Sequence, residues 1–254
     1  MKPNFRLSNR ASSPLASALV LGGLALSVIS TTQAAERRFA YSYEAQTYVP
    51  GSIEVENWVT WQDRAGADRF DFRHEIEVGV TEKLQLGFYL VDWRHTEGGE
   101  SEYHDTAIEA IYNLTNPNTD WIGSSLYGEV KFAKEFLELE GKIILQKNWG
   151  PVSLVYNVAL EAEWEEEGLE ETKGEVAQTL GLSYMVSPKF SVGAEMLSEV
   201  EFEDWGGAGP HALYFGPNAS LRGERHWLTA AGLWEVTGTD EPDFQLRAIW
   251  GIHF

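Results

Sequence analysis

The chain ends in DFQLRAIWGIHF (243–254), a stretch in which every second residue is apolar. A two-residue period places side chains alternately on the two faces of a β-strand, so one face of this strand is apolar. Chain termini of soluble domains are usually polar and frayed. We therefore expect this face to contact lipid, with the core of a soluble β-sandwich or lipocalin-like barrel as the alternative. The apolar residues are Phe244, Leu246, Ala248, Trp250, Ile252 and Phe254.

Residues 1–34 have the order of a secretory signal peptide. Lys2, Arg6 and Arg10 form a basic start, LASALVLGGLALSVI (15–29) is apolar, and small residues follow, with the cleavage site expected after Ala34. The apolar run is shorter than the roughly 20 residues that a membrane-spanning helix needs. We therefore predict that the leader is removed and that the protein is exported.

Composition narrows the classes of function. The sequence has no cysteine, which excludes a disulfide framework and thiol chemistry. Loss of three bases with the leader takes the net charge from −20 to about −23, which argues against binding of nucleic acid. Ten tryptophans and 13% aromatic residues are too many for a disordered acidic chain, so the acidic residues belong to a folded domain.

After residue 51, segments with two-residue alternation follow one another and are separated by turn residues. GSIEVENWVTWQ (51–62) is an example, with Ile53, Val55, Val59 and Trp61 on one face. The pattern predicts an all-β fold, an antiparallel up-and-down transmembrane β-barrel of twelve strands, with ten or fourteen as alternatives. Residues 35–50 are expected to be a periplasmic or lumenal lead-in, and residues 51–254 the outer-membrane β-barrel. The expected strands lie near 52–62, 68–80, 84–94, 103–114, 121–134, 138–148, 152–164, 174–186, 190–202, 211–221, 226–237 and 243–254.

The connections also suggest a barrel in the outer membrane of a Gram-negative bacterium. Short turns such as TEK (81–83) alternate with longer acidic or glycine-rich loops such as HTEGGESEY (95–103) and EEEGLEETKGE (165–175). Outer-membrane barrels have short periplasmic turns, long external loops and aromatic girdles at both interfaces. Tryptophans near the expected strand ends fit such girdles, and they are Trp61, Trp93, Trp121, Trp164, Trp227 and Trp250.

The face opposite the apolar one is expected to line the lumen, and it is rich in glutamate. Charges this dense cannot all remain ionised without partners, so some should pair with the few bases across neighbouring strands. An open lumen would favour cations and pass small solutes, whereas a plugged lumen would leave a structural or surface-interaction barrel. The residues predicted to line the lumen are Glu54, Glu56, Arg73, Glu75, Glu77, Glu109, Glu129, Lys131, Glu161, Glu163, Glu195 and Arg247.

No motif indicates catalysis, a cofactor or a metal site. The sequence lacks G-x-S-x-G, and Ser124 and Ser125 lie in an expected strand with His104 as the nearest histidine on the preceding one. His95 and His104 flank an acidic loop, but neither belongs to a histidine pair with the i, i+2 spacing of strand ligands. We expect a protein that is not an enzyme and has no resident cofactor or metal.

Two stretches carry a resemblance to known proteins. YVPGSIEVENWVTW (48–61) and LYFGPNASLRGERHWLTAAGLWEV (213–236) resemble segments of a family of uncharacterised bacterial outer-membrane β-barrels. That family is similar to barrels labelled as transporters of the meta-pathway of phenol degradation. The resemblance implies a barrel and passage of small, partly apolar molecules, and it supplies no catalytic residue. The ending on Trp250 and Phe254 resembles the signal read by the barrel-assembly machinery, so the expected partners are that machinery, outer-membrane lipid and lipopolysaccharide.

Overall fold

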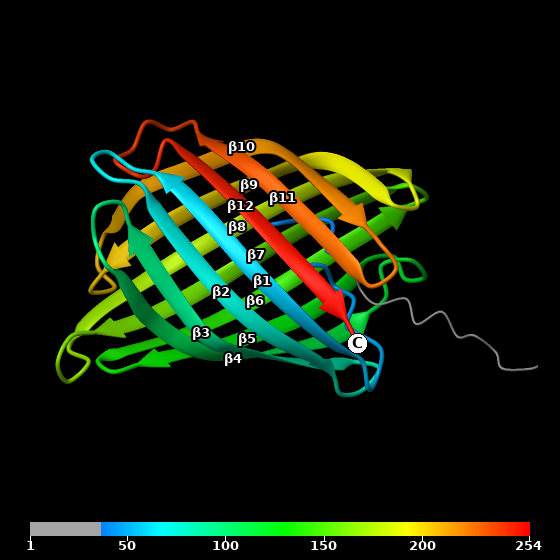
Figure 1. Ribbon diagram of the computed structural model, residues 1–254, viewed down its shortest axis with the longest axis horizontal. Helices are drawn as coiled ribbons and strands as arrows, with labels where there is room; N and C mark the ends of the chain where they lie inside the picture. Colours follow the sequence, from blue (N-terminus) through cyan, green and yellow to red (C-terminus); the bar gives the residue numbers. More distant parts are fainter. Residues whose placement is uncertain (1–36) are drawn as a thin grey trace, which may run out of the picture. The chain divides into compact units, whose positions relative to one another are not determined.

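The computed structural model describes residues 37–254, so the predicted leader at 1–34 lies outside the described residues. From residue 53 onwards, two-residue alternation forms antiparallel strands (Figure 1). The strands are β1 (Ile53–Asp63), β2 (Arg69–Gly79), β3 (Leu84–Thr96), β4 (Ser101–Thr115), β5 (Gly123–Ala133), β6 (Phe136–Trp149), β7 (Val152–Glu165), β8 (Glu171–Ser187), β9 (Phe190–Glu203), β10 (Ala208–Arg222), β11 (His226–Glu235) and β12 (Phe244–His253).

The sheet closes on itself. Each strand pairs with its neighbours in the chain, and β1 pairs antiparallel with β12, with Trp58 opposite Ile249. Closure leaves no strand edge with unpaired backbone groups. The prediction of an all-β antiparallel barrel of twelve strands is confirmed. Within residues 37–254 there is no helix that could cross a membrane.

The terminal strand presents the face expected from its alternation. Leu246 and Trp250 are exposed on the outside of the barrel, whereas Gln245 and Ile249 are buried inside. Gly251 also faces inward, where a Cβ would lie 2.7 Å from Cζ2 of the Trp227 ring. The two positions that interrupt the polar face of this strand, Ile249 and Gly251, are therefore explained by packing inside the barrel.

Two details of the expected layout are wrong. The acidic stretch 165–175, taken as a loop, is mostly strand, since β7 and β8 leave only 166–170 between them. Positive φ at Glu166, Gly168 and Leu169 allows a tight turn there, so the ladder continues past the acidic residues. Trp227, expected in an aromatic girdle, is buried in the lumen, where its indole Nε1 donates to Glu54 Oε1 at 2.7 Å.

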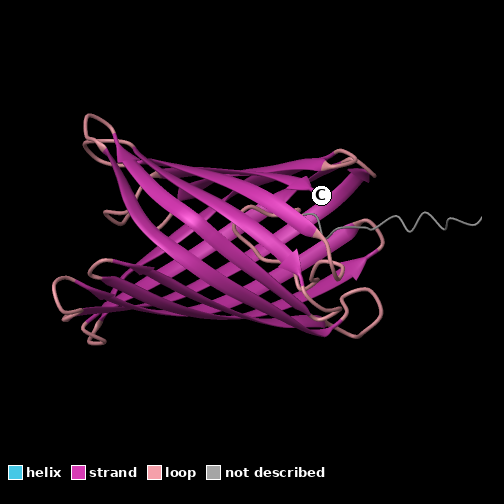
Figure 2. Ribbon diagram, turned by 60° about the horizontal axis from the view of Figure 1, so that its bottom comes forward, coloured by secondary structure: helices cyan, strands magenta, loops and turns pink. Residues whose placement is uncertain are grey.

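Residues 37–48 precede β1 and run through the inside of the barrel without forming a strand (Figure 2). Phe39 and Ala45 are fully buried, and Ala40 and Ser42 are 2% exposed. The Phe39 ring lies against Gly181 of β8, where a Cβ would be 2.5 Å from the nearest ring atom, Cδ1. We call residues 37–48 the lumenal segment. It forms the centre of the barrel interior.

Candidate functional site

The lumenal segment is held at its first half by a single carboxylate. Glu195 of β9 accepts three successive backbone N–H groups, from Ala40 at 2.7 Å, Tyr41 at 2.8 Å and Ser42 at 2.9 Å. Asn218 of β10 also donates to Glu195, at 3.0 Å. Bonds to an ionised acceptor are roughly twice as strong as neutral ones, so Glu195 is the main anchor of this half.

Amide side chains of the barrel wall hold the second half of the lumenal segment. Asn157 of β7 accepts the Tyr43 N–H at 2.6 Å and donates to the Tyr43 carbonyl at 3.0 Å, which imitates the pairing of a neighbouring strand. Gln146 of β6 accepts the N–H of Ala45 at 2.7 Å. The wall thus supplies, from side chains, the partners that a buried backbone requires.

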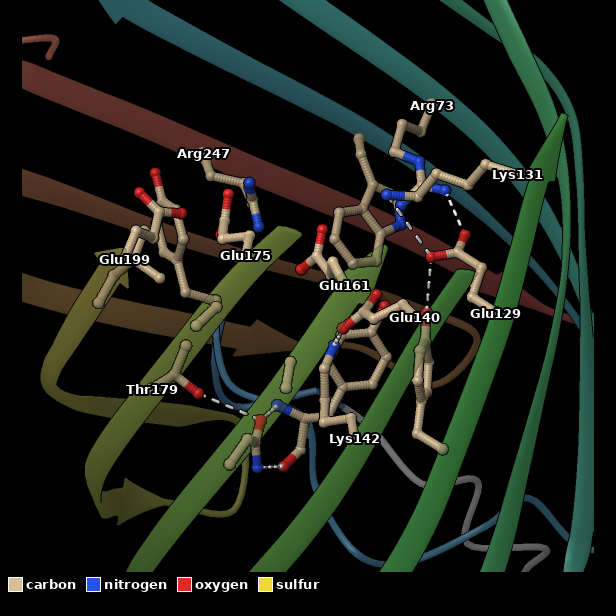
Figure 3. Close-up of a pocket in the computed structure, with 18 residues that line it drawn as sticks. Arg73, Glu129, Lys131, Glu140, Lys142, Glu161, Glu175, Thr179, Glu199 and Arg247 are labelled. Carbon is tan, nitrogen blue, oxygen red and sulfur yellow. Dashed lines mark hydrogen bonds and ion pairs between the residues drawn. The ribbon is translucent and has the colours of Figure 1, made fainter. Parts of the chain in front are cut away.

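Two cavities lie inside the barrel, and Figure 3 shows the smaller of them. The smaller, of about 170 Å³, contacts Tyr41 and Tyr43 of the segment. The larger, of about 440 Å³, extends to Arg64 and Glu165 near the loops. Trp58 and Arg73 border both cavities, so the two are neighbours, and we call them together the vestibule.

Carboxylates outnumber bases in the vestibule wall. Twelve carboxylates and seven Lys or Arg side chains line the two cavities. The acidic residues are Asp71, Asp92, Asp105, Glu129, Glu138, Glu140, Glu161, Glu163, Glu165, Glu175, Glu199 and Glu201, and the Lys and Arg residues are Arg64, Arg69, Arg73, Arg94, Lys131, Lys142 and Arg247.

Strand register aligns many of these acids in one row. From β1 to β9, the paired inward positions carry glutamate on every strand except β3, where the row contains Gly87. Neighbouring members of such a row lie close together on one face of the sheet. The row consists of Glu54, Glu77, Gly87, Glu109, Glu129, Glu140, Glu161, Glu175 and Glu201.

The predicted lumen bases differ in their contacts. Arg73 contacts Asp92 at 2.6 Å and Glu129 at 2.5 Å, and Lys131 contacts Glu138 at 2.6 Å. Arg247 contacts β1 and the lumenal segment instead: it donates to Thr60 Oγ1 at 3.0 Å and to the Ala40 carbonyl at 3.5 Å, and its guanidinium group lies 4.1 Å from the centroid of the Tyr41 ring. Arg247 therefore braces the lumenal segment against β1.

The predicted acids occupy three places in the lumen. Glu129, Glu161 and Glu163 border the vestibule, and Glu195 anchors the lumenal segment. The others gather near the seam between β1 and β12, each at most 1% exposed, and they are Glu54, Glu56, Glu75, Glu77 and Glu109. Here Arg37 of the lumenal segment contacts Glu56 at 3.1 Å and Glu77 at 3.6 Å. His253 contacts Glu54.

Sequence reasoning missed several residues of the site. Glu140 and Lys142 form a 2.6 Å ion pair on the vestibule wall. They share the two-residue spacing of Ile144 and Gln146, so the same alternation could have identified them. Arg37 and Asn157 could not be assigned in this way, because their roles depend on the path of the lumenal segment.

The candidate catalytic residues lie apart. Ser124 and Ser125 are at the beginning of β5 and not in its middle, and Ser125 Oγ donates to the Ala45 carbonyl at 2.6 Å. His104 lies near the beginning of β4, so the antiparallel pairing places it at the opposite end of the sheet. His104 Nδ1 contacts Asp105 at 2.6 Å, and His95 contacts Ser101 at 3.2 Å.

Solved structures with a similar fold are outer-membrane channels and porins. The COG4313 outer membrane channel from Pseudomonas putida F1 has a TM-score of 0.61 at 12% identity, over 83% of this chain and 98% of that one. The NanC porin gives 0.55 at 8% identity, over 80% and 98%. The KdgM porin in complex with disordered oligogalacturonate gives 0.50 at 9% identity, over 80% and 98%. At these identities the likeness concerns the fold.

No protein of curated function matches the sequence. A family model does, over residues 31–247, which include the lumenal segment and the strands through the first part of β12. The chain belongs to the family of unknown function DUF6662.

Proposed function

We propose that the protein is an outer-membrane channel for small solutes, with an acid-lined lumen that favours cations. The observation that carries this proposal is the vestibule, where carboxylates from β2 to β9 outnumber the bases. The fold shared with outer-membrane channels and porins supports it.

An apolar belt on the outer wall supports a position in the membrane. Ile108 and Phe215 are 46% and 56% exposed on strands far apart in the sheet, and Leu160 between them is 54% exposed. Large apolar residues on the outside of a closed barrel are what lipid contact requires. Outer-membrane lipid and lipopolysaccharide are thus the proposed surroundings. The barrel-assembly machinery is the proposed partner for the end of the chain at Trp250 and Phe254.

The wall chemistry suggests which solutes pass. Galacturonate units carry carboxylates, so an oligogalacturonate such as that in the KdgM complex would be repelled by an acid-rich wall. Small cations or neutral molecules suit it better. The rings of Tyr41, Tyr43 and Tyr127 around the smaller cavity would also accept a small, partly apolar solute, as the resemblance to barrels labelled meta-pathway transporters implies.

The lumenal segment favours a second candidate, a structural barrel with a filled lumen. Its backbone is bonded to the wall from β6, β7 and β9, and Phe39 and Ala45 are fully buried. In the channel proposal, this segment narrows the lumen and limits conductance. In the structural alternative, it closes the lumen permanently.

Single-channel recording in planar bilayers separates the two candidates. We expect refolded protein to give small, discrete conductance steps, because the lumenal segment leaves only part of the cross-section free. The complete absence of steps, from protein whose heat-modifiable migration shows a folded barrel, would refute the channel and favour the structural alternative.

A further inference from the structure

Three buried carboxylates near the seam of the barrel face one another, and Arg37 contacts one of them, Glu77, at 3.6 Å. Glu75, Glu77 and Glu109 come from β2 and β4, and one oxygen from each lies within 4.8 Å of the others. None is more than 1% exposed. Isolated carboxylates this buried and this close cannot all carry charge unless a cation or protons neutralise them.

The oxygens that lack partners point to where a ligand would bind. Neither Glu75 oxygen accepts a hydrogen bond from any residue between 37 and 254, and the same holds for Glu77 Oε2 and Glu109 Oε1. The remaining oxygens are oriented by neighbours: Gln85 Nε2 donates to Glu77 Oε1 at 2.7 Å, and the Tyr89 hydroxyl donates to Glu109 Oε2 at 3.0 Å. The unpaired oxygens are thus positioned by an ordered surrounding shell.

Gly87 of β3 provides the space for this group. It pairs with Glu77 on one side and Glu109 on the other, in the place where the glutamate row would otherwise continue. A Cβ at residue 87 would lie 2.9 Å from Glu109 Cδ and would also collide with the Glu75 carboxylate. The absence of a side chain at residue 87 allows the carboxylates to converge.

A second acidic group, Glu54, Glu56 and Glu77, has comparable spacing but already has partners. Arg37 contacts Glu56, and Trp227 donates to Glu54. Glu75, whose two oxygens both lack a hydrogen-bond partner within residues 37–254, belongs only to the group over Gly87.

We propose that Glu75, Glu77 and Glu109 form a binding site for one divalent cation of the calcium type. Calcium binds carboxylate oxygens at about 2.4 Å, so its ligands lie up to about 4.8 Å apart, as they do here. Smaller magnesium demands regular octahedral geometry and keeps several waters, which suits this enclosed site less well. The site lies beside the lumenal segment, since Tyr89 and Tyr43 approach within 3.5 Å at their hydroxyls. The proposal is independent of channel activity.

Calcium binding by the folded, detergent-solubilised full barrel tests this site. After treatment with EDTA and dialysis into 150 mM NaCl, we expect calorimetric titration with CaCl₂ to show one saturable site per chain, with MgCl₂ at least tenfold weaker. The substitutions Glu75→Gln and Glu109→Gln should each weaken calcium binding tenfold or more, because each removes a charged ligand. The control is Glu140→Gln, a buried lumen glutamate already paired with Lys142 at 2.6 Å, which should bind as the wild type does.

Heat-modifiable migration in gels would confirm that each variant is folded. In addition, calcium should slow the thermal unfolding of the wild type and leave that of Glu75→Gln unchanged. Equal calcium affinity in Glu75→Gln and the wild type would overturn the proposal, because it would indicate diffuse electrostatic attraction of calcium to the acidic residues instead of binding at this site. So would the absence of saturable binding at any pH between 6 and 8, which would show that protons neutralise the group.

Discussion

Replacing Glu195 by alanine should release the first half of the lumenal segment. Glu195 accepts the N–H groups of Ala40, Tyr41 and Ser42 at 2.7–2.9 Å, and the substitution removes all three bonds at once. Hydrogen bonds to a charged group contribute about 1.5–3 kcal/mol each. Even a loss of about 3 kcal/mol, less than the low sum of about 4.5 kcal/mol for three such bonds, shifts the ratio of docked to released segment by roughly a hundredfold.

The absence of cysteine from the sequence makes this release measurable. Ser42, which is 2% exposed, can be changed to cysteine as a single label site inside the barrel. A maleimide reagent should modify Ser42→Cys slowly in the parent barrel and roughly a hundredfold faster with Glu195→Ala, because the reagent reaches the thiol only when the segment is released. Single-channel conductance should rise in the same variant.

Glu199→Ala is the matched control. Glu199 lies on the same face of β9 and borders the smaller cavity, but within residues 37–254 it makes no hydrogen bond to the lumenal segment. Its removal should leave the labelling rate of Ser42→Cys near that of the parent. If Glu195→Ala and Glu199→Ala label alike, the anchoring role assigned to Glu195 is wrong.

Three further predictions concern the barrel wall. Gly251→Ala should destabilise the barrel by about 1–3 kcal/mol in urea unfolding, because the added Cβ collides with Trp227. Gly141→Ala is the control and should not destabilise the barrel, because a Cβ at residue 141 has nothing within 4 Å. Equal effects of the two substitutions would contradict the packing argument. Arg73→Met should cost about 3–5 kcal/mol by leaving its buried carboxylate partners unpaired, and an unchanged urea midpoint would refute this. Deletion of Phe254, which is 78% exposed, should lower the yield of assembled barrel in cells, measured by heat-modifiable migration, and an unaltered yield would count against its role in assembly.

The sequence predicts the barrel well because a single physical rule governs most of it. A strand between lipid and a polar lumen must alternate, so the number of strands and the outward face of Leu246 and Trp250 follow from the period of two. The inward glutamates follow from the same rule. The loop lengths do not, because acidic and glycine residues are compatible with both a strand end and a turn, as at 165–175.

The arrangement of residues inside the barrel could not be predicted from the two-residue period of the sequence. The cluster of Glu75, Glu77 and Glu109 depends on the register of three strands, and register is set by turn geometry and barrel closure. The lumenal segment has an alternating sequence, FAYSYEAQTY (39–48), that resembles a strand. It is not one here, because side chains such as Glu195 and Asn157 satisfy its backbone in place of a neighbouring strand.

The reversal potential of single channels under a KCl gradient tests the central claim most directly. The wall of the vestibule has more carboxylates than bases, so an open lumen should concentrate K⁺ over Cl⁻. We predict a reversal potential with the sign of cation preference. The cation preference should diminish as the KCl concentration on both sides increases, because salt screens the wall charges. A reversal potential with the sign of anion preference would contradict the acid-lined channel proposed for this protein.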